Sequence, residues 1–185
     1  MILFFKIVAF LVLTLIVLRL FFIQYFTKKI VEDYLKGESP FIPVKPEFLE
    51  QIVETMEIDE KDTVYDLGCG DARMLVSCQN AHPEAKYIGI EKNFVPYFWV
   101  KLRLLYLGKS AKIKIIHQDF FKADLSDATA IFLYLIPKQI VRLEEKFERE
   151  LKPGTKVLAF KYPLQKKEPE KVSGLEGDKI YFYKF

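Results

Sequence analysis

Two hydrophobic patterns divide the chain, and the first covers its opening residues. From Ile2 to Ile23 the sequence is almost continuously apolar, and its only charged residues are Lys6 and Arg19. A helix of this length rises roughly 33 Å, which is enough to cross the hydrocarbon core of a bilayer. Its eighteen Leu, Ile, Phe and Val residues, at about −0.3 to −0.6 kcal/mol each, outweigh about +3 kcal/mol for one off-centre arginine. The pattern predicts a transmembrane helix.

A buried core helix and a cleaved signal peptide are the alternative interpretations of this segment. A signal peptide would have a shorter apolar stretch, a more basic start and a small-residue cleavage site, but residues 24–29 read Gln-Tyr-Phe-Thr-Lys-Lys. Basic residues on the C-terminal flank outnumber Lys6 and the amino terminus; they are Arg19, Lys28, Lys29 and Lys36. The positive-inside rule therefore predicts a single-pass protein whose C-terminal domain lies on the cytoplasmic side.

Short apolar stretches alternate with amphipathic ones over the rest of the chain. Gly37-Glu38-Ser39-Pro40 interrupts a helical continuation, so the expected organisation is an anchor over 1–26, a linker over 27–39 and a domain over 40–185. Strands are expected at 63–67, 86–91, 112–117, 130–135, 156–161, 171–173 and 179–184, and helices at 48–56, 72–80, 95–107 and 138–151. Such alternation favours an α/β fold: a Rossmann-like, mostly parallel seven-strand sheet with helices on both faces and an antiparallel last strand.

Composition and charge narrow the possible functions. The chain of 185 residues is 51% hydrophobic and 29% charged, and the anchor explains the combination. The first thirty residues carry four basic residues and no acid, so the +3 net charge belongs to the anchor and the domain is nearly neutral. We therefore expect no nucleic-acid partner. Two cysteines are too few for a disulfide framework and agree with a reducing compartment.

A glycine-containing loop follows the first predicted strand. The chain reads Asp66-Leu67-Gly68-Cys69-Gly70-Asp71-Ala72-Arg73, and a helix is expected to begin there. Glycines at a strand end let the backbone approach a ligand beside a helix N-terminus. Arg73 stands where the dinucleotide fingerprint has its third glycine, and Asp66 would repel a pyrophosphate but attract an ammonium group. The loop therefore indicates a nucleoside ligand with a cationic end rather than a nicotinamide dinucleotide.

Two further acids end the next two predicted strands. Glu91 comes 21 residues after Gly70, where a carboxylate accepts hydrogen bonds from ribose hydroxyls. Asp119 follows the third strand and is placed to accept from an adenine amino group, while Phe120 offers an aromatic face. Each acid alone is more often a helix cap or a solvated turn residue. Together with the glycine loop, however, they describe one cleft at the carboxyl edge of the sheet.

These motifs resemble the cofactor motifs of class I S-adenosylmethionine-dependent methyltransferases. Residues from about Pro40 onward are similar to a family of membrane-anchored protein-lysine methyltransferases that modify the ATP synthase c subunit and the adenine nucleotide translocase. The similarity lies in residues 40–43, 66–73, 91–93, 132–137, 143–146 and 150–154, and in the final aromatic strand. The sequence departs from that family at Ala72, where the family usually has glycine, and in its short C-terminal tail.

The resemblance implies S-adenosyl-L-methionine as cofactor and assigns roles to individual residues. Its cofactor residues would be Asp66, Gly68, Cys69, Gly70, Glu91, Asn93, Asp119 and Phe120. Tyr134 and Pro137 would orient the acceptor amine, and Phe41 and Pro43 would form its channel, although ordinary core packing explains Phe41 and Tyr134 equally well. The implied activity is protein-lysine N-methylation of a membrane protein by an enzyme bound to the bilayer.

Three alternative functions remain open. They are methyl transfer to a small or lipid-soluble molecule, a non-catalytic role as a membrane scaffold, and a nicotinamide oxidoreductase activity, which Asp66 and Arg73 disfavour. We expect no metal, because His82 and His117 have no partners at ligand spacing and Cys69 and Cys78 are nine residues apart.

Overall fold

The chain divides into two compact units, Met1–Phe41 and Ile42–Phe185. The computed structural model describes residues 1–109, 112–174 and 177–185, except for the side chains of Phe26, Asp33 and Tyr34. The first unit is the long helix α1 (Ile2–Lys36) followed by a short non-helical segment. The helix continues without interruption over the first ten residues of the expected linker, and only the part from Gly37 onward is non-helical.

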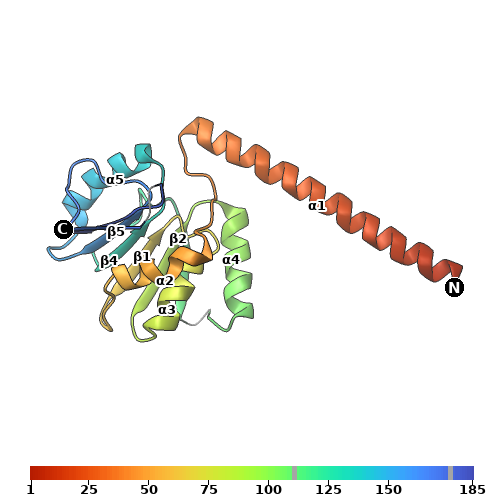
Figure 1. The fold of residues 1–185 in the computed structure, drawn as a ribbon, viewed down its shortest axis with the longest axis horizontal. Helices are drawn as coiled ribbons and strands as arrows, with labels where there is room; N and C mark the ends of the chain where they lie inside the picture. Colours follow the sequence, from red (N-terminus) through yellow and green to blue (C-terminus); the bar gives the residue numbers. More distant parts are fainter. Residues whose placement is uncertain (110–111, 175–176) are drawn as a thin grey trace. The chain divides into compact units, whose positions relative to one another are not determined.

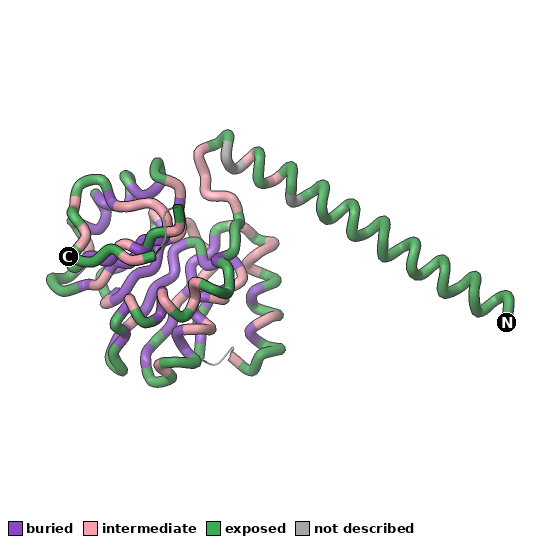
Figure 2. The backbone as a smooth tube through the Cα atoms, viewed as in Figure 1, coloured by how far each residue is buried: buried purple, intermediate pink, exposed green. Residues whose placement is uncertain are grey.

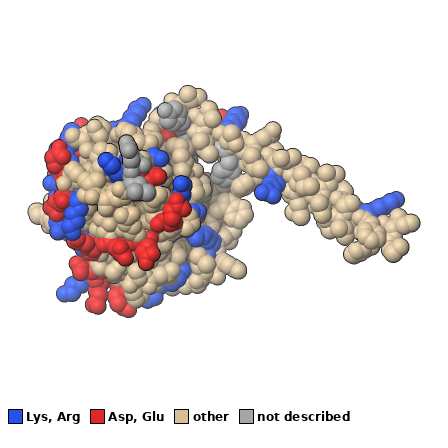
Figure 3. All heavy atoms as spheres, in the orientation of Figure 1, with Lys and Arg blue, Asp and Glu red and all other residues tan. Residues whose placement is uncertain are grey.

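Figure 2 shows most of helix α1 in the colour of exposed residues, and its exposed residues include large apolar side chains from Ile2 to Leu35. Figure 3 shows it as mostly uncharged surface with isolated basic residues. Residues Ile2–Glu32 are long and apolar enough to cross a membrane, and none of the most apolar stretch is buried. Signal sequences and the core helices of soluble proteins have a similar length and composition, but a core helix would be mostly buried.

The second unit is built on a seven-stranded sheet with the order β3-β2-β1-β4-β5-β7-β6 (Figure 1). Its strands are β1 (Thr63–Leu67), β2 (Lys86–Glu91), β3 (Ile113–His117), β4 (Ala130–Leu133), β5 (Lys156–Phe160), β6 (Lys171–Ser173) and β7 (Ile180–Lys184). Strands β1 to β5 pair in parallel, whereas β7 is antiparallel to both β5 and β6. The predicted mostly parallel seven-strand fold is therefore confirmed.

Alternating side chains of the strands separate two cores, one on each face of the sheet. The first core lies under α3 (Arg73–Ala81) and α4 (Phe94–Tyr106), with α2 (Pro46–Thr55) beside α3. The second lies under α5 (Pro137–Glu150), which contributes Ile140, Leu143 and Phe147. Every residue of both cores belongs to Ile42–Phe185. The second unit therefore contains all of the packing that its own fold requires.

Strand β4 ends earlier than the sequence pattern predicts. Tyr134 and Leu135 were expected to extend it, but the strand stops at Leu133. The next residues lead to Pro137, the first residue of α5, and Ile136 is extended with φ −69° and ψ 153°. A residue before proline is disfavoured in the helical region, so the chain leaves the sheet as a short extended segment. This segment places Tyr134 beyond the strand end.

Candidate cofactor and acceptor site

The loop after β1 turns sharply against the neighbouring strand β2. Gly68 and Gly70 have φ of +86° and +51°, a region that favours glycine. The N–H groups of Gly68 and Cys69 both donate to the carbonyl oxygen of Ile90, at 2.8 and 3.0 Å. The loop backbone is therefore held at the carboxyl edge of the sheet by hydrogen bonds to β2.

The small side chain of Cys69 packs this loop closely against strand β2. Its side chain is buried and lies over Gly89, where an added Cβ would be 2.7 Å from the Cys69 sulfur. Burial raises the pKa of the Cys69 thiol well above its ordinary value, so the thiol stays protonated and only the backbone of Cys69 is available to a ligand. Gly89 was not identified from the sequence, although a glycine inside a strand often marks such a close approach.

Glu91 joins the glycine loop to the start of α4. One carboxylate oxygen accepts from the Gly70 N–H at 3.1 Å, and the other accepts from the Asn93 N–H at 2.7 Å. Burial raises the pKa of Glu91, while these two hydrogen bonds oppose the rise. The remaining lone pairs of a carboxylate fixed in this way suit vicinal hydroxyls such as those of a ribose. Asn93 contributes its backbone N–H and makes no side-chain hydrogen bond that caps the helix.

Asp66 is a buried acid in a negative environment. Burial, and then the charges of Glu91 and Asp71, raise its pKa to about 8. The neighbouring charges that act on it are thus both negative. A cationic group placed here would favour the ionised carboxylate. The residue fits the cationic end of S-adenosylmethionine.

Asp71, which was not assigned a role from the sequence, organises the far side of the loop. It forms an ion pair with Arg73 at 2.8 Å, and its carbonyl oxygen accepts from Arg103 of α4. Arg73 also donates to the carbonyl oxygen of Val44 at 2.8 Å. Arg73 therefore links the loop to the segment before α2 that contains Pro43.

Ala72 stands where the similar family usually has glycine, at a position whose backbone conformation favours glycine. It has φ of +55° and is completely buried. This left-handed conformation costs a non-glycine residue of the order of 1 kcal/mol. The start of α3 tolerates the alanine, but at a cost in strain.

At the end of β3 the structure distinguishes the two residues expected to contact adenine. Asp119 is half-buried and accepts from the Phe121 N–H at 3.0 Å. Phe120 is only 7% exposed and belongs to the second core, which leaves little of its ring for a ligand. His117, which pairs in register with Glu91, stacks on Tyr97 at 4.8 Å. This pair is an additional aromatic surface at the same edge. Tyr97 lies on α4 and His117 ends β3, so no local sequence pattern joins them.

The acceptor candidates lie on the next strand end and before α2. The Tyr134 ring is half-buried against Phe160 at 5.0 Å, and burial raises the pKa of its hydroxyl. The adjacent Leu135 is the nearest neighbour of a Cβ added at Gly68, at 3.4 Å, so this segment borders the glycine loop. Pro137 is exposed at the start of α5, and Pro43 is exposed before α2. Phe41 ends the first unit and is also exposed.

No group of three or more His, Cys, Asp or Glu side chains that could hold a metal ion is found in the described part of the chain. The clustered groups of the site are instead backbone N–H donors, glycines and buried carboxylates. Such a set suits an organic ligand with hydroxyl and ammonium groups.

Comparison with known proteins decides the family. Residues 66–171 match the model of the ANTKMT methyltransferase domain. The chain belongs to this family. The matched region begins at Asp66 and contains every predicted cofactor residue together with Tyr134 and Pro137.

Curated relatives of this methyltransferase are protein-lysine N-methyltransferases by name. The enzyme from Saccharolobus islandicus is 28% identical over 78% of this chain and 92% of its own length. The human lysine N-methyltransferase of the ATP synthase c subunit is 25% identical over 78% of this chain. The chain spans only 60% of the human protein.

A solved structure supports the same cofactor. An RNA methyltransferase from Salinibacter ruber, in complex with S-adenosyl-L-homocysteine, has a TM-score of 0.74 and 29% identity, and it covers 77% of this chain and 93% of its own. The family and this complex make the protein an S-adenosylmethionine-dependent methyltransferase. The buried Asp66, the glycine loop and the fixed Glu91 carboxylate fit that cofactor.

Proposed function

We propose that this methyltransferase transfers a methyl group to a lysine side chain of a membrane protein. The supporting observation is that the Saccharolobus protein-lysine N-methyltransferase matches over nearly its whole length. Mouse adenine nucleotide translocase lysine N-methyltransferase also matches, at 24% identity over 80% of this chain and 64% of its own length. Both named acceptors among the relatives, the ATP synthase c subunit and the adenine nucleotide translocase, are proteins.

We assign the cofactor contacts to the carboxyl edge of β1, β2 and β3. Asp66 accepts from the ammonium group, the Gly68–Gly70 backbone faces the ligand, and Glu91 accepts from the ribose hydroxyls. Asp119 accepts from the adenine amino group, Asn93 acts through the backbone N–H that fixes Glu91, and Phe120 offers only the small exposed part of its ring. Bound S-adenosylmethionine supplies an activated methyl group on a sulfonium, so the protein chiefly needs to align the acceptor and exclude water.

The acceptor amine must reach the site uncharged. Deprotonating a lysine with a pKa near 10.4 at pH 7 costs about 4.6 kcal/mol, and a nearby positive charge lowers that cost. Burial raises the pKa of the Tyr134 hydroxyl, which stays protonated, and the adjacent Leu135 borders the glycine loop; Tyr134 is our candidate for orienting the amine. Pro137, Phe41 and Pro43 are proposed to line the approach of the lysine side chain.

We further propose that α1 anchors the enzyme in the bilayer with the catalytic domain on the cytoplasmic side. Its apolar side chains are exposed around the helix, which in water would leave a large apolar area unburied. The flanking Lys28 and Lys29 favour the cytoplasmic side. Extraction of the full-length protein at alkaline pH, together with protease protection in sealed vesicles, tests both statements. Release into the soluble fraction would contradict the anchor.

A labelling experiment tests the acceptor. The full-length protein in native membranes is given S-adenosylmethionine with a labelled methyl group, and protein, lipid and RNA fractions are counted separately. We expect label in protein, located on lysine by mass spectrometry, and much less label with Glu91→Ala. Label confined to lipid or to RNA would overturn the lysine assignment. If calorimetry detects no cofactor binding by the unmodified protein, the non-catalytic scaffold is supported instead.

Tyr134→Phe tests the orienting role. Loss of the hydroxyl should lower kcat at least tenfold while the affinity for S-adenosylmethionine, measured by calorimetry, stays within about twofold. The matched control is Tyr162→Phe, a half-buried tyrosine packed against the second core. Equal effects of the two substitutions on kcat would exclude a specific role for Tyr134.

A further inference from the structure

Helix α4 buries one side and leaves a broad apolar surface on the other. Val100 and Leu104 are buried in the first core. The outer side carries large apolar and aromatic residues that are between 43% and 91% exposed: Phe94, Phe98, Trp99, Leu102, Leu105 and Tyr106. We call these six residues the α4 outer surface. So many exposed large apolar residues on one helix indicate an interaction surface.

The spacing of these residues makes the surface continuous. Phe94, Phe98, Leu102 and Leu105 are four, four and three positions apart, which places them in one row along a helix. The rings of Phe94 and Phe98 are 6.4 Å apart and stacked, and Trp99 meets Phe98 at the same distance edge-on. The row is therefore a single apolar strip, with Trp99 and Tyr106 beside it.

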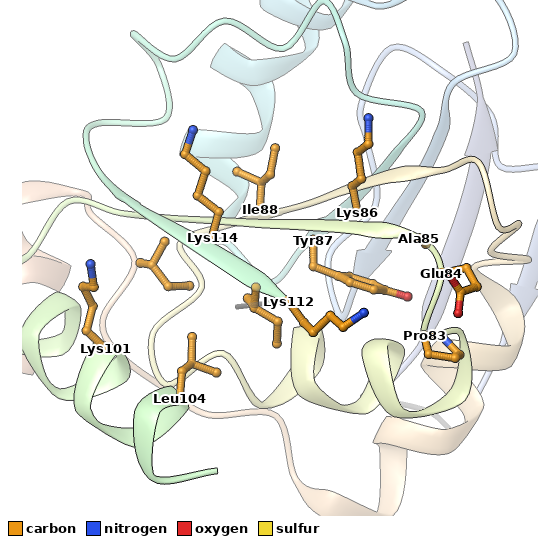
Figure 4. Close-up of a pocket in the computed structure, with 12 residues that line it drawn as sticks. Pro83, Glu84, Ala85, Lys86, Tyr87, Ile88, Lys101, Leu104, Lys112 and Lys114 are labelled. Carbon is orange, nitrogen blue, oxygen red and sulfur yellow. The ribbon is translucent and has the colours of Figure 1, made fainter. Parts of the chain in front are cut away.

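The surroundings of this strip are positively charged. Residues 92–118 contain six Lys or Arg residues and no Asp or Glu. A groove of about 630 Å³ runs beside the buried Leu104, and its charged lining is four lysines and one acid: Lys86, Lys101, Lys112, Lys114 and Glu84. Figure 4 shows Lys101 projecting from α4, Lys86 from β2 and Lys114 from β3. An apolar, aromatic strip bordered by lysines is complementary to the surface of an anionic membrane.

We propose that the α4 outer surface docks on an anionic membrane, with Phe, Trp and Leu side chains at the headgroup boundary and the neighbouring lysines on lipid phosphates. Tryptophan and tyrosine are the side chains preferred at that boundary. The proposal goes beyond the methyl-transfer reaction and rests partly on the anchoring role proposed for α1. Only nine residues separate the end of α1 at Lys36 from the start of α2 at Pro46, and they span at most about 30 Å. An anchored domain thus stays within reach of the membrane surface.

Docking through α4 would also bring the reaction site close to the membrane surface. The helix begins at Phe94, directly after Asn93, whose N–H is bound by the Glu91 carboxylate. The strip therefore starts beside the residues proposed to hold the ribose. A domain held by this helix presents its cofactor edge near the bilayer, where lysines at the ends of membrane-spanning segments lie.

Trp99 is the only tryptophan in the chain, so its fluorescence reports on this surface directly. The full-length protein is reconstituted in vesicles of phosphatidylcholine with one-third phosphatidylglycerol. We expect a blue-shifted emission that lipids brominated on their acyl chains quench and aqueous acrylamide does not. Emission typical of water, with acrylamide quenching alone, would overturn the proposal. Protection from both quenchers would indicate a protein partner or a second copy on the strip, and would overturn it as well.

A second experiment separates docking from the anchor. The fragment 42–185, which contains both cores, is sedimented with the same vesicles. Phe98→Glu with Leu105→Glu should lower partitioning by more than about tenfold, whereas Val172→Glu, at an equally exposed valine of β6, should not. Circular dichroism checks that each variant is folded.

Removing charges tests the lysines in the same assay. Lys101→Ala, Lys112→Ala and Lys114→Ala should each reduce binding to anionic vesicles about fivefold, while Lys61→Ala and Lys152→Ala, which lie outside the groove lining, should change it little. Failure of the fragment to bind vesicles would overturn docking and leave the anchor and the methyl transfer intact. Binding of single-stranded RNA through these lysines in place of vesicles would also overturn it.

Discussion

Two aspartates four residues apart in the sequence, Asp62 and Asp66, lie at opposite edges of the sheet and differ in their partners and in their pKa values. Asp62 precedes β1 at the amino edge, where it accepts from the Thr129 hydroxyl at 2.6 Å, from the Asp59 N–H at 2.7 Å and from Lys156 at 2.9 Å. Burial opposes its ionisation, but these partners outweigh burial and lower its pKa. Asp66, near the carboxyl edge, has a pKa raised to about 8 by burial and by two neighbouring acids.

Asp62 therefore stabilises the fold, whereas Asp66 is available to bind a cationic ligand. The lowered pKa of Asp62 means that its contribution to stability is present above the unfolded pKa near 3.8 and is lost as the pH falls below it. For Asp66 the sign is reversed. Between about pH 4 and pH 8, Asp66 is protonated in the folded protein and ionised in the unfolded protein. The free energy of unfolding therefore falls as the pH rises through that window. A cationic ligand would offset this cost.

The largest effect is expected on stability, from a substitution at the amino edge of the sheet. Asp62→Ala removes three hydrogen bonds and leaves Lys156, whose side chain is 14% exposed, without its nearest acid. We expect the free energy of unfolding of fragment 42–185 to fall by about 3 kcal/mol in urea titrations, with cofactor affinity unchanged. Asp59→Ala is the control, because that carboxylate is 82% exposed and should contribute under about 1 kcal/mol. Equal losses would contradict a structural role specific to Asp62.

The next effect concerns the carboxyl edge. Asp66→Asn keeps the size of the side chain but removes the charge, and should weaken S-adenosylmethionine binding by about 2 kcal/mol, or roughly thirtyfold. The stability of the cofactor-free protein at pH 8 should stay level or rise, because the unfavourable ionisation is removed. Calorimetry and thermal unfolding measure the two quantities. A stability loss like that of Asp62→Ala, with unchanged affinity, would reverse the assignment of the two acids.

A smaller effect is the pH dependence of binding. Because the cofactor's ammonium group favours ionised Asp66, whose pKa is about 8 in the free protein, binding releases a proton. Affinity should therefore rise with pH between 6 and 7.5, by at most about tenfold per unit. Calorimetry in buffers of different ionisation enthalpy counts the protons. Asp66→Asn should remove the dependence, and an unmodified slope in that variant would assign the proton to another group.

The smallest effect is expected for the conservative substitution Glu91→Gln. Glu91→Gln removes the charge and keeps a single acceptor oxygen, so only one of the Gly70 and Asn93 N–H groups retains its acceptor and the amide NH2 replaces the other oxygen. Affinity for S-adenosylmethionine should fall by about 1 kcal/mol, roughly fivefold. Glu91→Ala, which also releases the Gly70 and Asn93 N–H groups, should cost about 1.5–3 kcal/mol. Identical affinities for all three proteins would place Glu91 outside the site.

Much of the architecture was predictable because it depends on local patterns. The strand–helix alternation indicated the parallel sheet, and Gly68 and Gly70 lie at positive φ as their residue type suggested. The early end of β4 was less predictable. Tyr134 and Leu135 are compatible with a strand, and only the effect of Pro137 on the residue before it indicates that the chain leaves the sheet. Gly89 under Cys69 was missed because the contact joins residues twenty positions apart.

What the sequence alone determined was the apolar helix, the order of elements and the three acids that follow strand ends, because periodicity and residue type specify them locally. Only the tertiary structure decided which acids have partners. Asp62 and Asp66 have identical side chains, and their pKa values diverge because packing brings Lys156 and Thr129 to one and Glu91 and Asp71 to the other. Likewise, Phe120 became a core residue while the aromatic residues of α4 stayed exposed. Burial and electrostatic environment arise from long-range packing, which no local pattern specifies.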